Sequence, residues 1–228
     1  VASFGPIDPK LGSDTYGFIT STPKPGWANT DVIGMLGLMK RENNNDNEEE
    51  YDCKIDGEFS HLPFLFDTDV NAPALAEFIH SQNENVTSSA YVTVGTGVGA
   101  GAVINSKPVA GMLHPEAGHI LVHRMEGDDY IGACPFHKNC LEGMVCSKAL
   151  AERAGLWKVD NDPTSGYDQT KLADLTDDHP IWDTAAYYLA QLAMSFILMV
   201  SIERIIYGGG IFNRKILYKK IRVNLKEM

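Results

Sequence analysis

The sequence is poor in positive charge, cysteine and long uncharged runs. Of its 228 residues, 19 are Lys or Arg and 30 are Asp or Glu, which gives a net charge of −11. A chain this acidic lacks the basic surface that nucleic acids and anionic membranes require, so neither is an expected partner. Its hydrophobic fraction of 44% and charged fraction of 21% are ordinary. They exclude a wholly disordered chain, a collagen and a disulfide-rich mini-protein.

No initiator methionine, basic region or long apolar run stands at the N-terminus, so no signal peptide is expected. The chain opens as if within a strand, and we expect the natural domain to begin upstream of it. One uncharged run, 184–202, is long enough to span a bilayer. Its internal Tyr, Gln and Ser residues and its charged flanks favour a buried core helix instead. We therefore expect a cytoplasmic protein without a membrane partner.

Before residue 60 the expected elements are short. A strand is predicted at 14–19, and polar residues at 29–31 can cap a helix running from about 32 to 40. The stretch 42–52 is acidic and poor in apolar residues, so burial cannot offset the entropy that it would lose on ordering. This composition predicts a solvated surface loop.

The later elements are longer. The segment 64–69 is typical of a strand that ends in carboxylates, and a helix is expected from about 72 to 83. A clear β run at 90–94 leads into a glycine-rich hairpin. From residue 144 onward the pattern is mostly helical, with a strand at 204–207 and a last helix after three glycines.

Four glycines alternate along the predicted hairpin, at Gly95, Gly97, Gly99 and Gly101, with Thr96 between the first two. Because glycine has no side chain, its N–H groups can approach an anion closely, and Thr96 adds a hydroxyl donor. A tightly packed hairpin without a ligand is equally compatible with the pattern. The Gly-Lys-Ser/Thr ending of a Walker A loop is lacking. A strand rather than a helix follows, which argues against a dinucleotide fingerprint.

Asp69 stands at the end of a predicted strand, where a carboxylate can accept a proton from a substrate hydroxyl. The alternative is a helix cap, a role for which Asp67 and Asn71 compete. The residues by themselves leave both interpretations open.

The most specific pattern is a cluster of nitrogen and sulfur donors. Cys134, His137 and Cys140 are spaced so that one tight loop can wrap a single ion, and His119 lies upstream. Zn²⁺ binds such donors tetrahedrally, and four protein ligands leave no position for water, so we expect a structural zinc site. His123 is an alternative to His119 that spacing does not separate. A buried thiol pair with an incidental histidine is the other interpretation.

Two carboxylates accompany this cluster, Glu116 before His119 and Glu142 after Cys140. A carboxylate accepts two hydrogen bonds, which suits the vicinal hydroxyls of a sugar. Ordinary surface carboxylates explain the pattern equally well.

Taken in order, these motifs resemble the ROK family of repressors, open reading frames and sugar kinases, and within it the bacterial-type fructokinases. The resemblance extends from about residue 5 to residue 224. It rests on Phe-Asp-Thr-Asp-Val-Asn-Ala at 66–72, Gly-Thr-Gly-Val-Gly-Ala-Gly at 95–101, His-Pro-Glu-Ala-Gly-His at 114–119, Cys-Pro-Phe-His-Lys-Asn-Cys-Leu-Glu-Gly at 134–143 and Gly-Gly-Gly at 208–210. The cysteine-rich element is the specific one, whereas each glycine motif is weak alone.

The resemblance implies an α/β protein with the actin-like ATPase (ribonuclease H-like) fold, which has two lobes with a cleft between them. An incomplete first lobe is expected over residues 1–71, including the acidic loop, and a second lobe over 72–228. The implied activity is that of a sugar kinase that phosphorylates a hexose, converting fructose to fructose 6-phosphate with ATP and Mg²⁺. The implied assembly is a homodimer.

The resemblance also implies roles for individual residues. The aspartate matching Asp69 is the general base for the sugar hydroxyl. The residues that line the sugar match Asn71, Glu116, His119 and Glu142. The loop that contacts the phosphates matches Gly95, Thr96, Gly97 and Gly99, and the segment beside the adenosine matches Gly208, Gly209 and Gly210.

One departure from the family leaves alternatives open. Family members begin with an Asp-x-Gly-Gly-Thr phosphate loop, which is absent here, so an inactive sugar-binding remnant is one alternative. A zinc-dependent hydrolase or deaminase is another, because His114, Glu116 and the following cysteines resemble an H-x-E…P-C-x-x-C pattern. Against it, Pro135 follows the first cysteine, and His137 stands where no ligand is needed.

Overall fold

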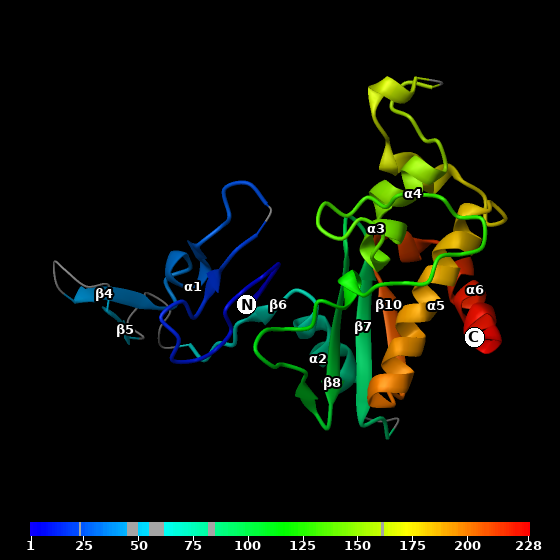
Figure 1. Cartoon of the computed structure of the whole chain (residues 1–228). Helices are drawn as coiled ribbons and strands as arrows, with labels where there is room; N and C mark the ends of the chain where they lie inside the picture. Colours follow the sequence, from blue (N-terminus) through cyan, green and yellow to red (C-terminus); the bar gives the residue numbers. More distant parts are fainter. Residues whose placement is uncertain (23, 45–49, 55–61, 82–84, 161) are drawn as a thin grey trace. The chain divides into compact units, whose positions relative to one another are not determined.

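The computed structural model describes the chain apart from residues 23, 45–49, 55–61, 82–84 and 161 (Figure 1). The chain divides into two compact units. The first unit contains residues 1–73 and 109–115, and the second contains residues 74–108 and 116–228.

The first unit is built from pairs of short strands. Their bounds are β1 (Ala2–Ser3), β2 (Phe18–Ile19), β3 (Thr30–Asp31), β4 (Lys40–Asn44), β5 (Glu50–Lys54) and β6 (Asp67–Thr68). β1 pairs in parallel with β6, whereas β2 with β3 and β4 with β5 form antiparallel pairs. The strands predicted at 14–19 and 64–69 are therefore each only two residues long, because turns occupy most of the first stretch.

Helix α1 (Val32–Met35) begins where the sequence predicts it. The Asp31 side chain accepts the N–H of Gly34 at 2.8 Å, which caps the helix. The helix ends after one turn, well before the expected end near residue 40. Gly37 has a φ of 65°, the left-handed conformation that glycine often adopts just past a helix C-terminus.

The prediction of a loop over residues 42–52 is wrong at both ends of this stretch. Strands β4 and β5 pair from Lys40 with Lys54 to Asn44 with Glu50, and residues 45–49 lie outside the described residues. Composition indicates whether a segment can bury apolar surface. It does not indicate strand pairing, because two antiparallel strands can satisfy their backbone N–H and C=O groups by hydrogen bonds to each other without burying a face.

The core of the first unit gathers apolar side chains from several short elements. They are Ile7, Tyr16, Ile19, Ile33, Leu38, Met39 and Phe66. The β1–β6 ladder continues one step further, because the N–H of Asp69 donates to the carbonyl of Ser3 at 2.8 Å. This bond fixes the backbone of Asp69 at the end of β6.

A four-stranded sheet forms the centre of the second unit. Its order is β10 (Arg204–Gly208), β7 (Ser88–Val94), β8 (Val98–Ile104), β9 (Lys107–Pro108). β7 and β8 form the predicted hairpin, closed by the pair of Val94 and Val98. β10 runs parallel to β7, and its position confirms the strand expected at 204–207.

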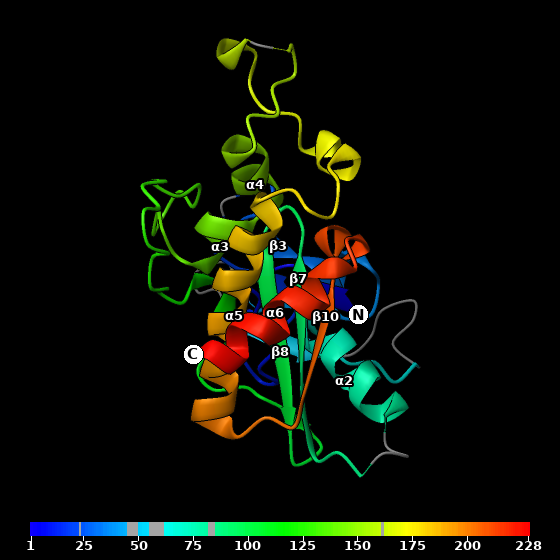
Figure 2. The same cartoon turned by 90° about the vertical axis from the view of Figure 1, so that its right-hand side faces the viewer.

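Helices cover both faces of this sheet. Their bounds are α2 (Asn71–His80), α3 (Leu141–Val145), α4 (Ser147–Arg153), α5 (Ile181–Val200) and α6 (Ile216–Glu227). α5 and α6 lie across one face, as Figures 1 and 2 show. On that face Val92, Val94, Val98 and Ala100 join the main core cluster. On the other face Ala74 and Phe78 of α2 pack with Val103.

The core helix predicted within the uncharged run is confirmed by the first part of α5, where Trp182, Tyr188 and Leu189 are buried. Its last turn is exposed, from Ile197 to Val200. Among the helices that the structure describes, α5 alone is long and apolar enough to cross a membrane by length and composition. A core helix passes the same test, so this finding is weak evidence of a membrane span.

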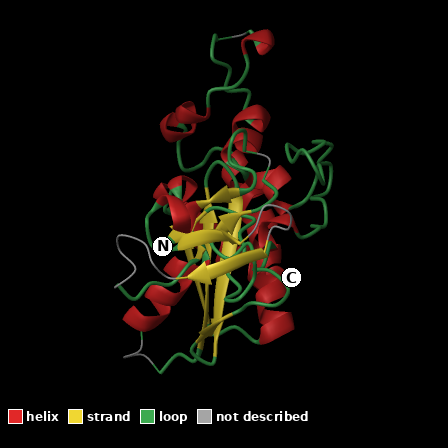
Figure 3. Ribbon diagram, turned by 90° about the vertical axis from the view of Figure 1, so that its left-hand side faces the viewer, coloured by secondary structure: helices red, strands yellow, loops and turns green. Residues whose placement is uncertain are grey.

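Two long connections of the second unit are irregular. One joins the 3₁₀ turn η2 (Ala117–His119) to α3, and the other joins α4 to α5 at the top of Figures 1 and 3. The second connection contains the turns η3 (Pro163–Ser165) and η4 (Gln169–Asp174), and a further turn, η5 (Gly210–Asn213), follows β10.

Candidate functional site

The four predicted metal ligands lie together in the second unit. His119, Cys134, His137 and Cys140 each offer one donor atom, and these atoms lie within 4.8 Å of one another. His119 Nδ1 is 3.5 Å from Cys140 Sγ and 3.8 Å from Cys134 Sγ, and His137 Nδ1 is 3.9 Å from Cys134 Sγ. Bonds of about 2.0–2.3 Å to a tetrahedral ion separate neighbouring ligands by roughly 3.3–3.8 Å. The donor set therefore fits Zn²⁺ in number and chemistry, and the shortest separations, of 3.5 and 3.8 Å, lie within this range.

Local backbone geometry produces this arrangement. Cys134 and Lys138 exchange backbone hydrogen bonds of 3.1 and 3.3 Å, and Lys138 adopts a φ of 57°, which closes a tight knuckle. A side chain at Gly132 or Gly143 would overlap the carbonyl of Lys138. A β-bridge between Leu121 and Cys140 brings the chain that follows His119 to the knuckle.

Both thiols of the cluster are buried. Cys134 is 2% exposed and Cys140 is fully buried. Burial, together with the neighbouring Cys134, raises the pKa of Cys140 to about 11. The thiolate form is therefore costly unless a positive ion accompanies it. His123 lies outside the four-donor group, and its backbone bonds to Gln191 instead.

The glycine-rich hairpin turns beside this knuckle. The N–H of Gly95 donates to the carbonyl of Gly97 at 2.9 Å, and Gly99 already lies within β8. The N–H of Val98 donates to Glu142 Oε2 at 3.0 Å. A Cβ at Gly97 would lie 2.7 Å from the same oxygen. Glu142 thus links the hairpin to α3, a contact that the sequence pattern does not reveal.

Glu116 precedes the turn η2 and His119 is its last residue, and the turn packs against the hairpin. A side chain at Gly118 would overlap the carbonyl of Val98, so glycine permits the close approach of the turn. Glu116 is exposed and His119 is half-buried. The second unit therefore brings together the hairpin, Glu142, His119 and the metal knuckle.

Asp69 and Asn71 belong to the first unit. The Asp69 side chain is exposed, whereas Asn71 is 2% exposed and donates from Nδ2 to Asp67 Oδ1 at 3.0 Å. The Oγ1 of Thr68 accepts the N–H of Asn71 at 2.9 Å at the start of α2. Thr68, which the sequence reasoning missed, serves the capping role for which Asp67 and Asn71 were candidates. The exposed Asp69 side chain is therefore not needed to cap α2.

Of the three glycines at 208–210, Gly208 ends β10 and Gly210 lines a cavity of about 440 Å³. Gly209 has a φ of 85° and lies so close to β7 that a side chain would overlap the carbonyl of Val94. Gly210 lines the cavity together with Ser147, Gln169, Thr170, Leu172, Ala173, Trp182, Ile211, Asn213 and Arg214. These other lining residues were missed because they come from segments far apart in the sequence.

Comparison with known proteins decides the family. The family model described as "ROK family" matches residues 32–228. The chain belongs to the ROK family. A protein named fructokinase from Streptococcus mutans is 37% identical over 225 residues, which cover 97% of this chain and 64% of that protein. This ROK chain spans between 60% and 65% of the length of the curated fructokinases that it matches.

Solved structures of ROK proteins share the fold. The ROK hexokinase from Thermus thermophilus superposes with a TM-score of 0.68 at 21% identity, covering 99% of this chain and 67% of that one. A ROK glucokinase from Streptomyces griseus, solved in complex with glucose and AMPPNP, gives 0.64 at 18% identity, covering 100% of this chain and 72% of that one. The likeness confirms the actin-like ATPase fold that the motifs imply.

Proposed function

We propose that this ROK protein is a sugar kinase that transfers the γ-phosphoryl group of ATP to fructose, giving fructose 6-phosphate. One observation carries the proposal: the hairpin, Glu142, His119 and the four-donor knuckle converge in one place. The names of the curated relatives, which are fructokinases at 33–37% identity, support the choice of sugar.

In this proposal Glu116, His119 and Glu142 recognise the sugar. Carboxylate oxygens accept hydrogen bonds from vicinal hydroxyls, and the ring nitrogen of His119 that does not bind the metal can donate one. A sugar that lacks one of these hydroxyls leaves a partner unpaired, which is the physical basis of selectivity. The hydrogen bond from Val98 to Glu142 Oε2 orients the carboxylate, and Oε1 can then receive a hydroxyl.

The proposed metal is a structural zinc ion held by His119, Cys134, His137 and Cys140. When bound, it would cross-link the knuckle to the turn that carries His119, and it would activate no water. A hydrolase or deaminase needs an open coordination position, and four protein donors leave none. The donor set therefore supports the kinase over that alternative.

The nucleotide is proposed to lie along the hairpin and the cavity beside Gly210. The hairpin offers backbone N–H groups and the exposed Thr96 hydroxyl to phosphate oxygens. The cavity of about 440 Å³ is large enough for a nucleoside. Mg²⁺ would accompany ATP, because phosphoryl transfer depends on positioning and on neutralising the phosphate charge.

Asp69 is proposed as the general base that takes the proton from the attacking sugar hydroxyl. Its exposure at the end of β6 supports this role, and the backbone bond to Ser3 holds its position. Asn71 is proposed to support the sugar site indirectly, without touching the sugar, because its buried amide group donates a hydrogen bond to Asp67.

The decisive variant is Asp69→Asn, with Asp14→Asn as a matched exposed acid of the same unit. Removing a general base should lower kcat by about 10²–10⁴-fold while fructose still binds, as measured by a coupled ADP assay and by calorimetry. The control should keep wild-type kcat. A kcat of Asp69→Asn that stays within roughly tenfold of the wild-type kcat would exclude Asp69 as the base. Fructose binding without nucleotide binding would support a sugar-binding protein that transfers no phosphate.

A further inference from the structure

The segment between the first and second metal donors has almost no regular structure. We call residues 120–133 the bridging segment, since it joins His119 to Cys134. Its two ends are fixed, because the carbonyl of Ile120 accepts the N–H of Leu141 at 2.9 Å and the N–H of Ala133 donates to Gly143 at 2.8 Å. The position of His119 relative to Cys134 therefore depends on what holds the middle of the segment.

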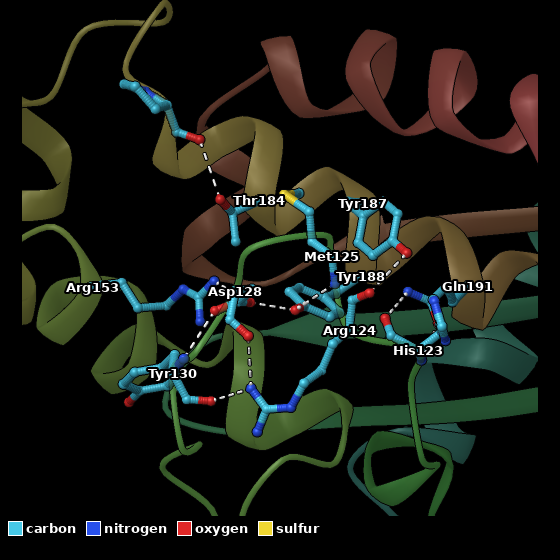
Figure 4. A network of polar contacts seen from close by, with 11 residues as sticks. His123, Arg124, Met125, Asp128, Tyr130, Arg153, Thr184, Tyr187, Tyr188 and Gln191 are labelled. Carbon is cyan, nitrogen blue, oxygen red and sulfur yellow. Dashed lines mark hydrogen bonds and ion pairs between the residues drawn. The ribbon is translucent and has the colours of Figure 1, made fainter.

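One face of α5 holds the first half of the bridging segment (Figure 4). The Gln191 side chain accepts the N–H of His123 at 2.7 Å and donates to its carbonyl at 2.9 Å, as a neighbouring strand would. The hydroxyl of Tyr188 accepts the N–H of Met125 at 3.1 Å. Residues three and four apart share a helix face, which lets both side chains reach the same segment.

Asp128 anchors the second half. Its Oδ2 accepts from Arg153 Nη2 at 2.7 Å and from the hydroxyl of Tyr188, and its Oδ1 accepts the N–H of Tyr130 at 3.1 Å. The side chains of Arg153 and Asp128 are only 10% and 8% exposed. Arg124 stabilises the same half of the segment, because its side chain donates to the carbonyls of Asp128 at 3.2 Å and Tyr130 at 2.6 Å.

The hydroxyl of Tyr188 occupies the centre of this arrangement. Because it donates its single proton to Asp128, it meets the N–H of Met125 as an acceptor. One atom thus ties two points of the bridging segment to α5.

We propose that Tyr188, Gln191 and Asp128 form a clasp that positions the metal knuckle and, through His119, the sugar. The inference rests on the proposed function, since it presumes a bound metal and a sugar. Groups that bond directly to metal ligands commonly change affinity by about 10–100-fold without touching the ion, and the clasp acts one step further out, so the lower end of this range is expected. The clasp residues are positioning residues, and they contact no ligand themselves.

The test compares Tyr188→Phe and Gln191→Met with Tyr207→Phe in the full chain loaded with Co²⁺ or Zn²⁺. Tyr207 is the matched control, because it belongs to the same core cluster and its hydroxyl donates to the carbonyl of Leu189 rather than to the bridging segment. Transfer of the metal to a chelator should become about tenfold faster in the two clasp variants, with a changed Co²⁺ absorption spectrum. The control should match wild type.

Kinetics give a second readout. The KM for fructose should rise about five- to tenfold in the clasp variants, while kcat stays within about threefold, because positioning of the sugar is lost and the base is untouched. If metal release and the KM for fructose are both unchanged in the two clasp variants, the clasp is overturned, whereas the proposed kinase activity is not. Equal effects in Tyr207→Phe also overturn it, since they would reflect general core loosening. A wild-type protein that takes up neither metal overturns the zinc site and the clasp together.

Discussion

At the scale of single residues, Gly97 shows why the hairpin needs glycine at one particular position. The Gly97→Ala change would place a methyl group 2.7 Å from Glu142 Oε2 and push this carboxylate off the N–H of Val98. Loss of one hydrogen bond to a charged group costs about 1.5 kcal/mol, so kcat/KM for fructose should fall about tenfold.

The matched control for this substitution is Gly95→Ala. A Cβ at Gly95 meets no atom of the protein within 4 Å, so the contact between Glu142 and Val98 should persist and the KM for fructose should stay near the wild-type value. Steady-state kinetics at varied fructose concentrations measure both variants. Equal losses in the two variants would mean that hairpin flexibility, rather than the contact with Glu142, limits activity.

The sequence could predict residues whose chemistry depends on near neighbours. Cys134, His137 and Cys140 meet because their spacing fits one tight turn, and that is visible without a fold. The choice between His119 and His123 was not visible, because it depends on Gln191, 68 residues away in the chain from His123. The link between Glu142 and Val98 was hidden for the same reason, with a separation of 44 residues.

At the scale of elements, the ion pair of Asp128 and Arg153 joins the bridging segment to α4. Arg153 Nη1 is buried with no hydrogen-bond partner among the described residues, and the guanidinium lies 4.7 Å from the ring centre of Tyr130. Asp128→Asn leaves this cation without its counter-charge. Breaking a buried pair in this way should lower the free energy of unfolding by about 3–5 kcal/mol in urea titrations. The double variant with Arg153→Met should recover most of that loss.

The same pair has a pH signature. Burial alone would raise the pKa of the Asp128 carboxyl, but the hydrogen bonds from Arg153 and Tyr188 hold it below its ordinary value of 3.8. A lowered folded-state pKa adds stability above the unfolded value, and this stability is lost as the pH falls through the folded pKa. The difference in unfolding free energy between wild type and Asp128→Asn should therefore shrink below about pH 4. A difference that stays constant into that range would contradict the pairing.

Elements with a strong apolar period were predictable, and elements held by pairing were not. The first part of α5 and the β7–β8 hairpin follow from apolar runs that must be buried. The strands β4 and β5 are polar, and their pairing leaves no trace in the hydrophobic pattern. Helix α1 starts at a visible cap, but its early end depends on the conformation of Gly37 rather than on composition.

At the scale of the whole molecule, the two units contribute different parts of the proposed chemistry. The second unit carries the metal knuckle, the hairpin and the cavity beside Gly210, and the first carries Asp69. The family and its fold were predictable because the motifs follow one another in a characteristic order. The homodimer stays a prediction, which sedimentation equilibrium can test.

The central claim is phosphoryl transfer from ATP to fructose. The most direct measurement incubates the purified protein with fructose, Mg²⁺ and ATP labelled at the γ-phosphate, and then identifies the labelled sugar. The proposal predicts label on the 6-hydroxyl of fructose with the wild-type protein and almost none with Asp69→Asn. No labelled sugar from the wild-type protein, or label on a different hydroxyl, would contradict it.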